Sequence, residues 1–236
     1  MAAGEDGARH AHERRGAAAA GPGAARIASM VVAGICFCAL LAWVKATGVT
    51  PLDNAVMGLA VSVRTQGLTK FMEQVTTLAV PVAMFAVSVP AAAFAPVRRG
   101  WLCMMVNIAG SAAFNFLLKL LVMRPRPDEA LRLVVESSYS FPSGHTMAVA
   151  SFYGLVVWMI WHFGHNRRAR NVWTACLALV MAGVGMSRVY LGVHYPTDVL
   201  AGYCEALVWL GAYTWLVAPR MLEDERGERP AGPAAP

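Results

Sequence analysis

The stretch WLCMMVNIAGSAAFNFLLKLLVM, residues 101–123, decides the fold class of this chain. Lys119 is its only charged residue, and a helix of this length can cross the hydrocarbon core of a bilayer. Working outward, four further long apolar runs and one shorter run share this character: 27–46, 71–96, 172–191, 197–219 and 145–163. The chain is 57% hydrophobic and 14% charged, whereas soluble domains carry about 25% charged residues. The sequence therefore predicts an all-α polytopic membrane protein, a bundle of six transmembrane helices.

The composition outside these runs sets the domain boundaries and excludes several protein classes. Residues 27–219 form the predicted membrane domain, residues 1–26 a disordered N-terminal tail and residues 220–236 a C-terminal tail. The first run lacks a clean small-residue cleavage site, which favours a retained span over a signal peptide. All five cysteines lie inside apolar runs, so they indicate neither a disulfide framework nor a metal site. The net charge of +6 comes from residues beside spans, so we predict no nucleic-acid partner and no obligate protein partner.

The distribution of Lys and Arg predicts the orientation. With a cytoplasmic N-terminus and six spans, the inner segments hold 12 of the 20 Lys and Arg residues. The short loops around Arg98 and around 167–170 are the most informative, because the positive-inside bias acts through short loops. We therefore predict a multi-pass protein of the cytoplasmic (plasma) membrane with both termini cytoplasmic.

The first outer loop contains the start signal of a short helix. Thr50 is a typical N-cap, Pro51 fits the first helical position, and Asp53 places an acid in the first turn. The apolar residues that follow recur at helical spacing, which suits either the outer membrane surface or simple packing over the bundle. These residues are Leu52, Val56, Leu59 and Val63.

Three polar clusters lie at the predicted outer ends of the spans. The first is Lys119, six residues, then Arg126-Pro127; the second is Pro142-Ser143-Gly144-His145. The third is Ser187-Arg188, five residues, His194, three residues, then Asp198. The six-span topology places all three clusters at the extracytoplasmic face. The orientation rests on the inner loops alone, so this agreement is independent of it.

The charges of these clusters indicate an anion site. Lys119, Arg126 and Arg188 would repel a divalent metal and attract a phosphoryl group, whose transition state spreads charge over three oxygens. The backbone amides of Ser143 and Gly144 precede a predicted span and can add to an anion cradle at a helix N-terminus. We predict phosphate binding by these five residues, with no metal and no cofactor.

Two histidines complete a set able to hydrolyse a phosphate ester without metal. One attacks phosphorus and the other protonates the leaving oxygen. Asp198 lies four residues after His194, one helical turn away, so its carboxylate can fix the tautomer of that ring. This spacing assigns His194 as nucleophile, His145 as acid and Asp198 as the partner of His194.

The three clusters resemble the signature motifs of the type 2 phosphatidic acid phosphatase superfamily, which includes the vanadium haloperoxidases. All the motif positions are present. The resemblance implies a metal-independent phosphatase with a phosphohistidine intermediate, a six-helix core and an outer-face site. It also implies the same role for each of the residues assigned above, and a second role for His145 in activating water.

Other polar residues receive structural interpretations. Arg124, Arg132 and Lys70 are interpreted as interfacial anchors, with phosphate contact by Arg124 left open. A polar stripe repeats every four residues along 107–119, and Glu205 lies seven residues after Asp198. We predict that Glu205 hydrogen bonds to Asn115 or Ser111 of this stripe and locks the third span against the sixth; the rival is a proton path to His194.

The sequence thus predicts a membrane phosphatase acting on a lipid phosphate monoester or an isoprenoid diphosphate. Phosphatidylglycerol phosphate, phosphatidic acid and undecaprenyl diphosphate are all open, and the partners are this lipid and the bilayer. Two alternatives remain. A vanadium-dependent haloperoxidase could use the same anion site, and a non-enzymatic transporter would need a polar route across the membrane.

Overall fold

The computed structural model describes residues 22–80, 83–84, 86 and 100–227, and all regular structure in these ranges is helical. The helices are α2 (Pro22–Thr47), α3 (Pro51–Ser62), α4 (Gln66–Thr77), α6 (Gly100–Val122), the short 3-10 helix η1 (Glu129–Leu131), α7 (Gly144–Phe163), α8 (Arg167–Tyr190), α9 (Pro196–Leu216) and α10 (Ala218–Gly227). The all-α prediction is confirmed for this part of the chain.

Five helices within the described ranges are long and apolar enough to cross a membrane: α2 from Gly23, α6, α7, α8 and α9. They coincide with five of the six predicted runs. Half of the remaining run, 71–96, lies outside the described residues, together with Pro81 and Pro90, two prolines that can kink a span. The count of six spans therefore stays a prediction, as do the boundaries of the two tails.

The start of the run 71–96 differs from expectation, because α4 ends at Thr77 and a turn follows at 78–80. Pro81 comes directly after this turn in the sequence, and the residue before a proline is biased away from the helical conformation. The first residues of the run 71–96 therefore belong to α4, which ends before Pro81.

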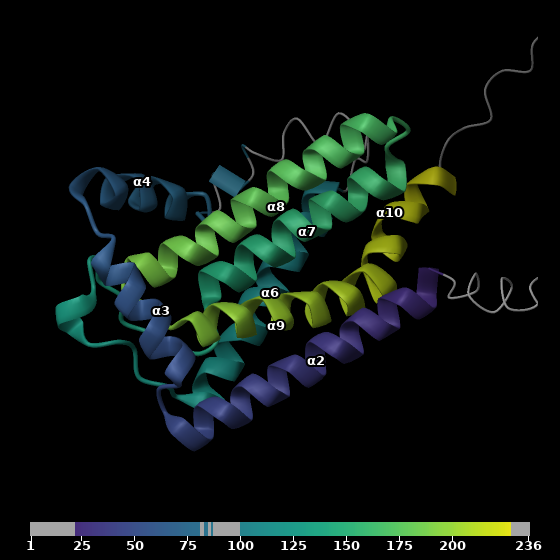
Figure 1. Cartoon of the computed structure of the whole chain (residues 1–236). Helices are drawn as coiled ribbons and strands as arrows, with labels where there is room; N and C mark the ends of the chain where they lie inside the picture. Colours follow the sequence, from purple (N-terminus) through teal and green to yellow (C-terminus); the bar gives the residue numbers. More distant parts are fainter. Residues whose placement is uncertain (1–21, 81–82, 85, 87–99, 228–236) are drawn as a thin grey trace, which may run out of the picture.

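The bundle is centred on α7, which contacts α6, α8 and α9, while α2 lies along α9 (Figure 1). Tyr213 near the end of α9 donates to Cys103 O near the start of α6, at 2.6 Å. Lys45 near the end of α2 donates to Val122 O at the end of α6, at 3.0 Å. Helices α2 and α6 therefore run in the same direction, and a span across 71–96 would connect them.

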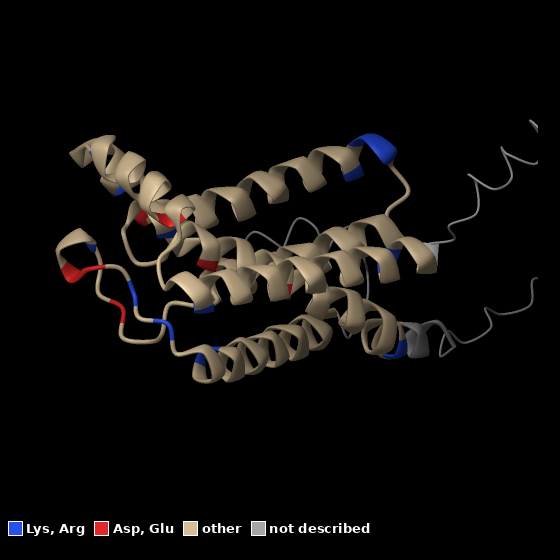
Figure 2. Cartoon of the chain, turned by 60° about the horizontal axis from the view of Figure 1, so that its bottom comes forward, with Lys and Arg blue, Asp and Glu red and all other residues tan. Residues whose placement is uncertain are grey.

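Most of the charged residues lie towards the two ends of the bundle (Figure 2). One end carries the short loop between α7 and α8 and the first turn of α8 with Arg167, Arg168 and Arg170, and α10 begins near the same end (Figure 1). The other end carries α3, α4 and the long segment between α6 and α7. This second end holds the three sequence clusters.

The predicted polar stripe of α6 is buried against α7 and α9. Asn115 Nδ2 donates to Glu205 Oε2 at 2.9 Å, which confirms the predicted tie between α6 and α9. Deeper in the bundle, Ser151 of α7 donates to Ser111, and Trp209 of α9 donates to Asn107. Buried polar groups are costly unless paired, so these bonds fix the rotation of α6 about its axis.

Helix α3 starts as predicted. Thr50 Oγ1 accepts from Asp53 N and Asp53 Oδ2 accepts from Thr50 N, a reciprocal capping box. The apolar stripe of α3 lines a groove of about 880 Å³ shared with α8 and α9. Whether α3 also lies on a membrane surface stays a prediction.

Candidate active site

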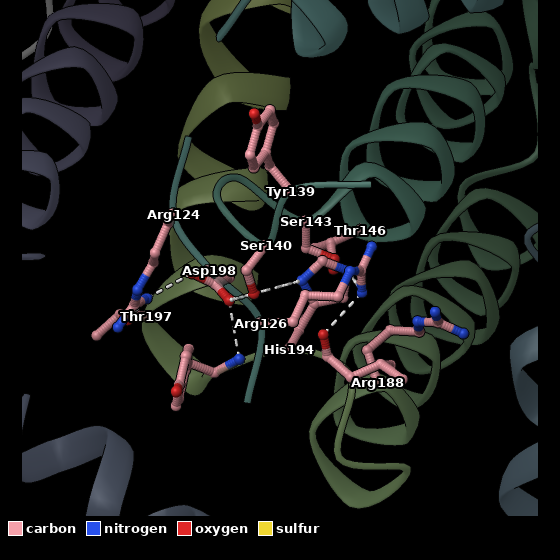
Figure 3. Close-up of polar contacts among 12 residues, drawn as sticks. Arg124, Arg126, Tyr139, Ser140, Ser143, Thr146, Arg188, His194, Thr197 and Asp198 are labelled. Atoms are coloured by element: carbon pink, nitrogen blue, oxygen red, sulfur yellow. Dashed lines mark hydrogen bonds and ion pairs between the residues drawn. The ribbon is translucent and has the colours of Figure 1, made fainter. Parts of the chain in front are cut away.

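The structure brings together all eight residues that the sequence proposed for the site. Lys119 comes from the last turn of α6, Arg126 from the segment after it, and Ser143, Gly144 and His145 from the start of α7. Arg188 comes from the last turn of α8, His194 from the loop after it, and Asp198 from the first turn of α9. Four helix ends therefore meet at one place (Figure 3).

Close contact between α7 and α9 sets the depth of the site. Ser143 N donates to Asp198 O at 3.0 Å, and a Cβ on Gly202 would lie 2.8 Å from Ser143 O. Glycine at 202 permits this approach. The contact also differs from expectation, because the backbone N–H of Ser143 is already used and an anion would meet the amides that follow it in α7.

The His194 ring is 1% exposed and has two different neighbourhoods. Its Nδ1 lies 3.6 Å from Asp198 Oδ2 and 3.5 Å from Ser140 Oγ. Its Nε2 lies 3.3 Å from Arg126 Nη1. A carboxylate beside Nδ1 favours the proton there, which leaves the Nε2 lone pair facing the arginine.

The protonation state of His194 suits a nucleophile. Burial lowers the pKa of His194 to about 3, although the nearby Asp198 carboxylate opposes this shift. The imidazole is therefore neutral at physiological pH and keeps a lone pair on one ring nitrogen. His145, by contrast, is half-buried at the first turn of α7.

Asp198 is fully buried, and both oxygens of its carboxylate accept hydrogen bonds. Its Oδ2 accepts from Ser140 Oγ at 2.5 Å and from Tyr195 N at 2.8 Å, in addition to facing His194. Its Oδ1 accepts from Arg124 Nη1 at 2.5 Å. Figure 3 shows Asp198 between Arg124 on one side and Ser140 and His194 on the other.

Arg124 is therefore not an interfacial anchor, and that interpretation is wrong. Its side chain is only 3% exposed and pairs with both Asp198 and Asp53. A buried guanidinium is stable only with such partners. Asp53 lies 71 residues earlier in the chain, so no local pattern predicted the pairing.

The cations on the other side of His194 are held by backbone carbonyls and hydroxyls. Arg126 donates to Ser138 O at 2.6 Å and to Val193 O at 2.7 Å. Arg188 Nη1 donates to Thr76 Oγ1 at 3.0 Å, and Lys119 Nζ donates to Tyr139 O. Arg188 Nε is buried and has no partner among the described residues, which leaves a donor for an anion.

Glu136, which sequence reasoning did not single out, joins two of these cations. Its Oε1 pairs with Arg188 Nη2, and its Oε2 lies 3.5 Å from Arg126 Nη2. Burial alone would raise the pKa of Glu136, but Arg188 and Arg126 outweigh it and hold the pKa below its ordinary value. An ionised carboxylate between both arginines marks a place where an anion is stable.

Comparisons with known proteins identify the family of this chain. A family model described as the PAP2 superfamily matches residues 100–222. Phosphatidylglycerophosphatase B of Bacillus subtilis is 32% identical over 176 residues, which cover 73% of this chain and 86% of that protein. Undecaprenyl-diphosphatase of Sulfolobus acidocaldarius is 33% identical over 91 residues, which cover 38% of this chain and 35% of that protein.

A solved structure shares the architecture. The crystal structure of a transmembrane PAP2 type phosphatidylglycerolphosphate phosphatase from Bacillus subtilis superposes with a TM-score of 0.69 and 28% sequence identity. The match covers 85% of this chain and 98% of that one. The family model spans more than half of this chain, and the Bacillus subtilis relative is matched over most of its length. The chain therefore belongs to the PAP2 superfamily of lipid phosphate phosphatases.

Proposed function

We propose that the protein is a metal-independent phosphatase that removes phosphate from a membrane lipid phosphate or diphosphate through a phosphohistidine on His194. The observation that carries the proposal is the pair of environments around His194. A carboxylate faces Nδ1, and a cationic anion site faces Nε2. This arrangement orients a neutral imidazole towards a bound phosphoryl group.

In the first chemical step, the phosphate displaces Glu136 from Arg126 and Arg188 and is also contacted by Lys119. His194 Nε2 attacks phosphorus, the bond to the ester oxygen breaks, and His145 gives its proton to that oxygen. The cations neutralise the charge that spreads over the three remaining oxygens. The alcohol or lipid product then leaves.

In the second step, His145 takes a proton from water and the resulting oxygen attacks phosphorus. The bond between phosphorus and Nε2 breaks, which restores neutral His194 and releases inorganic phosphate. Asp198 stabilises the positive charge that the imidazole carries between these steps.

A lipid substrate fits the surroundings of the anion site. A cavity of about 260 Å³ lies between α6 and α7, with Lys119 and Ser138 at its polar part and Phe116 and Met147 on its apolar part. Such a cavity suits a molecule with a phosphate at one end and a hydrocarbon chain at the other. The named relatives support phosphatidylglycerol phosphate and undecaprenyl diphosphate as candidates, and phosphatidic acid shares the same chemistry.

The deciding experiment measures phosphate release by detergent-purified protein in EDTA on these three lipids. We expect turnover by the wild type, none by His194→Asn, and wild-type turnover by His165→Asn, whose exposed ring lies far from the site between α7 and α8. If the folded wild type released no phosphate from any of the three lipids, or if EDTA abolished turnover, the proposal would be contradicted. Bromide oxidation with added vanadate would instead favour the haloperoxidase alternative.

The membrane orientation is part of the same proposal. Six spans with both termini cytoplasmic would place the site at the extracytoplasmic face of the cytoplasmic membrane. The cations at 167–170 support this orientation. A membrane-impermeant thiol reagent should label Glu129→Cys in intact cells, because this loop residue is 89% exposed beside the site. Labelling only after cell lysis would reverse the orientation.

A further inference from the structure

Arg124 contacts the catalytic carboxylate from the side opposite to the nucleophile. Its Nη1 donates to Asp198 Oδ1 and, at 2.8 Å, to Thr197 Oγ1. The other carboxylate oxygen, Oδ2, is the one that faces His194. The guanidinium therefore fixes the rotation of the carboxylate that orients the nucleophilic ring.

Arg124 is itself held by the segment between α2 and α3 and by the first turn of α3, both far from the three clusters in the sequence. Its Nη2 donates to Asp53 Oδ2 at 2.7 Å and to Gly48 O at 2.8 Å. Its guanidinium also lies over the ring of Tyr195, with 4.2 Å between Cζ and the ring centroid. All three nitrogens of this guanidinium donate hydrogen bonds, since Nε also donates to Gly48 O at 3.2 Å.

Asp53 makes a second connection to the catalytic helix. Its Oδ1 accepts from Thr197 N at 3.1 Å and from Thr197 Oγ1 at 2.8 Å. The start of α3 is thus tied to the start of α9 both directly and through Arg124. The capping box between Thr50 and Asp53 keeps the carboxylate of Asp53 in place for both contacts.

The charges in this network require one another. Asp53 and Asp198 are both fully buried carboxylates, and Arg124 is the cation that joins them. A planar guanidinium can place two N–H groups on two carboxylates, which the single ammonium of lysine cannot do with the same geometry. Without Arg124, Asp198 would be a buried charge with neutral donors and His194 only, a state that favours protonation or rotation.

We propose that Arg124 is a positioning residue for the reaction, acting on His194 through Asp198, and that Asp53 of α3 sets the position of Arg124. The proposal rests on the nucleophilic role of His194 given above. It adds two residues to the site. Arg124 is one of the six residues between Lys119 and Arg126 of the first motif, and Asp53 lies outside all three motifs. Neither residue touches the substrate.

The test compares Arg124→Gln with Arg64→Gln, a matched control. Arg64 also holds outer segments together, donating to Leu131 O at 2.8 Å and Tyr190 O at 2.9 Å, but it does not contact Asp198. For Arg124→Gln we expect kcat to fall about 10- to 100-fold, the usual loss when the partner of an oriented ligand is removed. KM should stay within about twofold, because the phosphate-binding cations are unchanged. Arg64→Gln should keep wild-type kcat and KM.

The pH profile supplies a readout that a purely structural role would not change. We expect the acidic limb of kcat in Arg124→Gln to move to higher pH, since Asp198 then loses a counter-charge. The charged or titratable groups that face this carboxylate are His194, Arg124 and Tyr195 directly, Lys119 and Arg126 at longer range, and Asp53 behind Arg124. Asp53→Asn should move the acidic limb of kcat in the same direction but by less. This variant replaces Arg124→Gln in the test if Arg124→Gln does not fold.

A measurement without substrate separates this proposal from the proposed function. Ring nitrogen-15 NMR of labelled protein, assigned with His194→Asn, should show the Nδ1–H tautomer of His194 in the wild type and a mixed state in Arg124→Gln. An unchanged tautomer in Arg124→Gln, or an equal loss of kcat in both arginine variants, would overturn the positioning role. Failure of the proposed function would instead appear as a wild type without phosphate release.

Discussion

The two sides of the His194 ring differ in how completely their charges are paired. On the Nδ1 side, Asp198 accepts from Ser140, Tyr195 N and Arg124, and these groups lie in the interior. On the Nε2 side, Arg126 and Arg188 share Glu136, whose side chain is 23% exposed and comes from the long segment between α6 and α7. The first side is closed and the second can exchange its anion.

In the proposed reaction, this difference lets His194 be both fixed in orientation and reactive. The Nδ1 side, which faces Asp198, holds the ring in one orientation, because breaking a hydrogen bond there leaves a buried polar group unpaired. The cationic side has more positive than negative charge, so a dianionic phosphate is better matched to it than the single carboxylate of Glu136. Four changes test this division, from the largest expected effect to the smallest.

Asp198→Asn should remove the carboxylate that faces Nδ1 of His194. We expect kcat to fall about 10³- to 10⁴-fold, because the amide no longer selects the Nδ1–H tautomer or stabilises the imidazolium. KM should change little, since the phosphate contacts remain. Steady-state kinetics on the best substrate measure this effect, and a variant that changes KM alone would contradict the division between the two sides.

Arg188→Lys should weaken the cationic side instead. The ammonium cannot replace a guanidinium that contacts Thr76 and an anion at once, so we expect kcat/KM to fall about 100-fold. The affinity for vanadate, a phosphate mimic, should fall in parallel, as followed by inhibition. Unchanged vanadate inhibition would place the anion elsewhere.

Glu136→Gln should leave the Nε2 side more positively charged, because it removes the carboxylate that pairs with Arg126 and Arg188. We expect vanadate to inhibit about 3- to 10-fold more tightly, because the ligand no longer competes with a carboxylate for Arg126 and Arg188. Glu129→Gln is the control, since this residue is on the same segment but pairs only with Arg132 among the described residues. Equal effects of both variants would point to general charge rather than to the site.

Acid should destabilise the protein partly through the burial of His194. Its pKa is lowered from 6.5 to about 3 in the folded state, so between these values the unfolded chain binds a proton that the folded protein does not. Stability is then lost as pH falls below 6.5, by up to about 1.4 kcal/mol per pH unit for this group. Thermal unfolding from pH 7 to 5 should show a shallower decrease in His194→Asn than in the wild type.

Short-range patterns explain what the sequence could predict. The i to i+4 spacing places Asp198 beside His194, and four-residue repeats along α6 place Asn115 on the face that meets Glu205. The N-cap, proline and acidic signals at 50–53 located the start of α3. In each case the information lies within a few turns of one helix, or in apolar runs that set which helices pack together.

Long-range pairing explains what it could not predict. Arg124 and Asp53 are 71 residues apart, and Glu136 meets Arg188 across 52 residues. Arg124 resembles an interfacial arginine in its local sequence, and Glu136 follows an apolar segment without any motif. Their roles depend on which loop packs over which helix end. Loops have no periodic sequence pattern from which such contacts could be predicted.

The pairing of Arg124 with Asp53 also limits how the protein can be divided or recombined. The family model begins at residue 100, whereas Asp53 and Gly48, which hold Arg124, precede it. A fragment or chimera that keeps only residues 100–222 would carry all three motifs and still lack the residues that hold Arg124 against Asp198. The transferable unit of this enzyme therefore begins before α3, and grafts between relatives should exchange the 48–53 turn together with the residue at position 124.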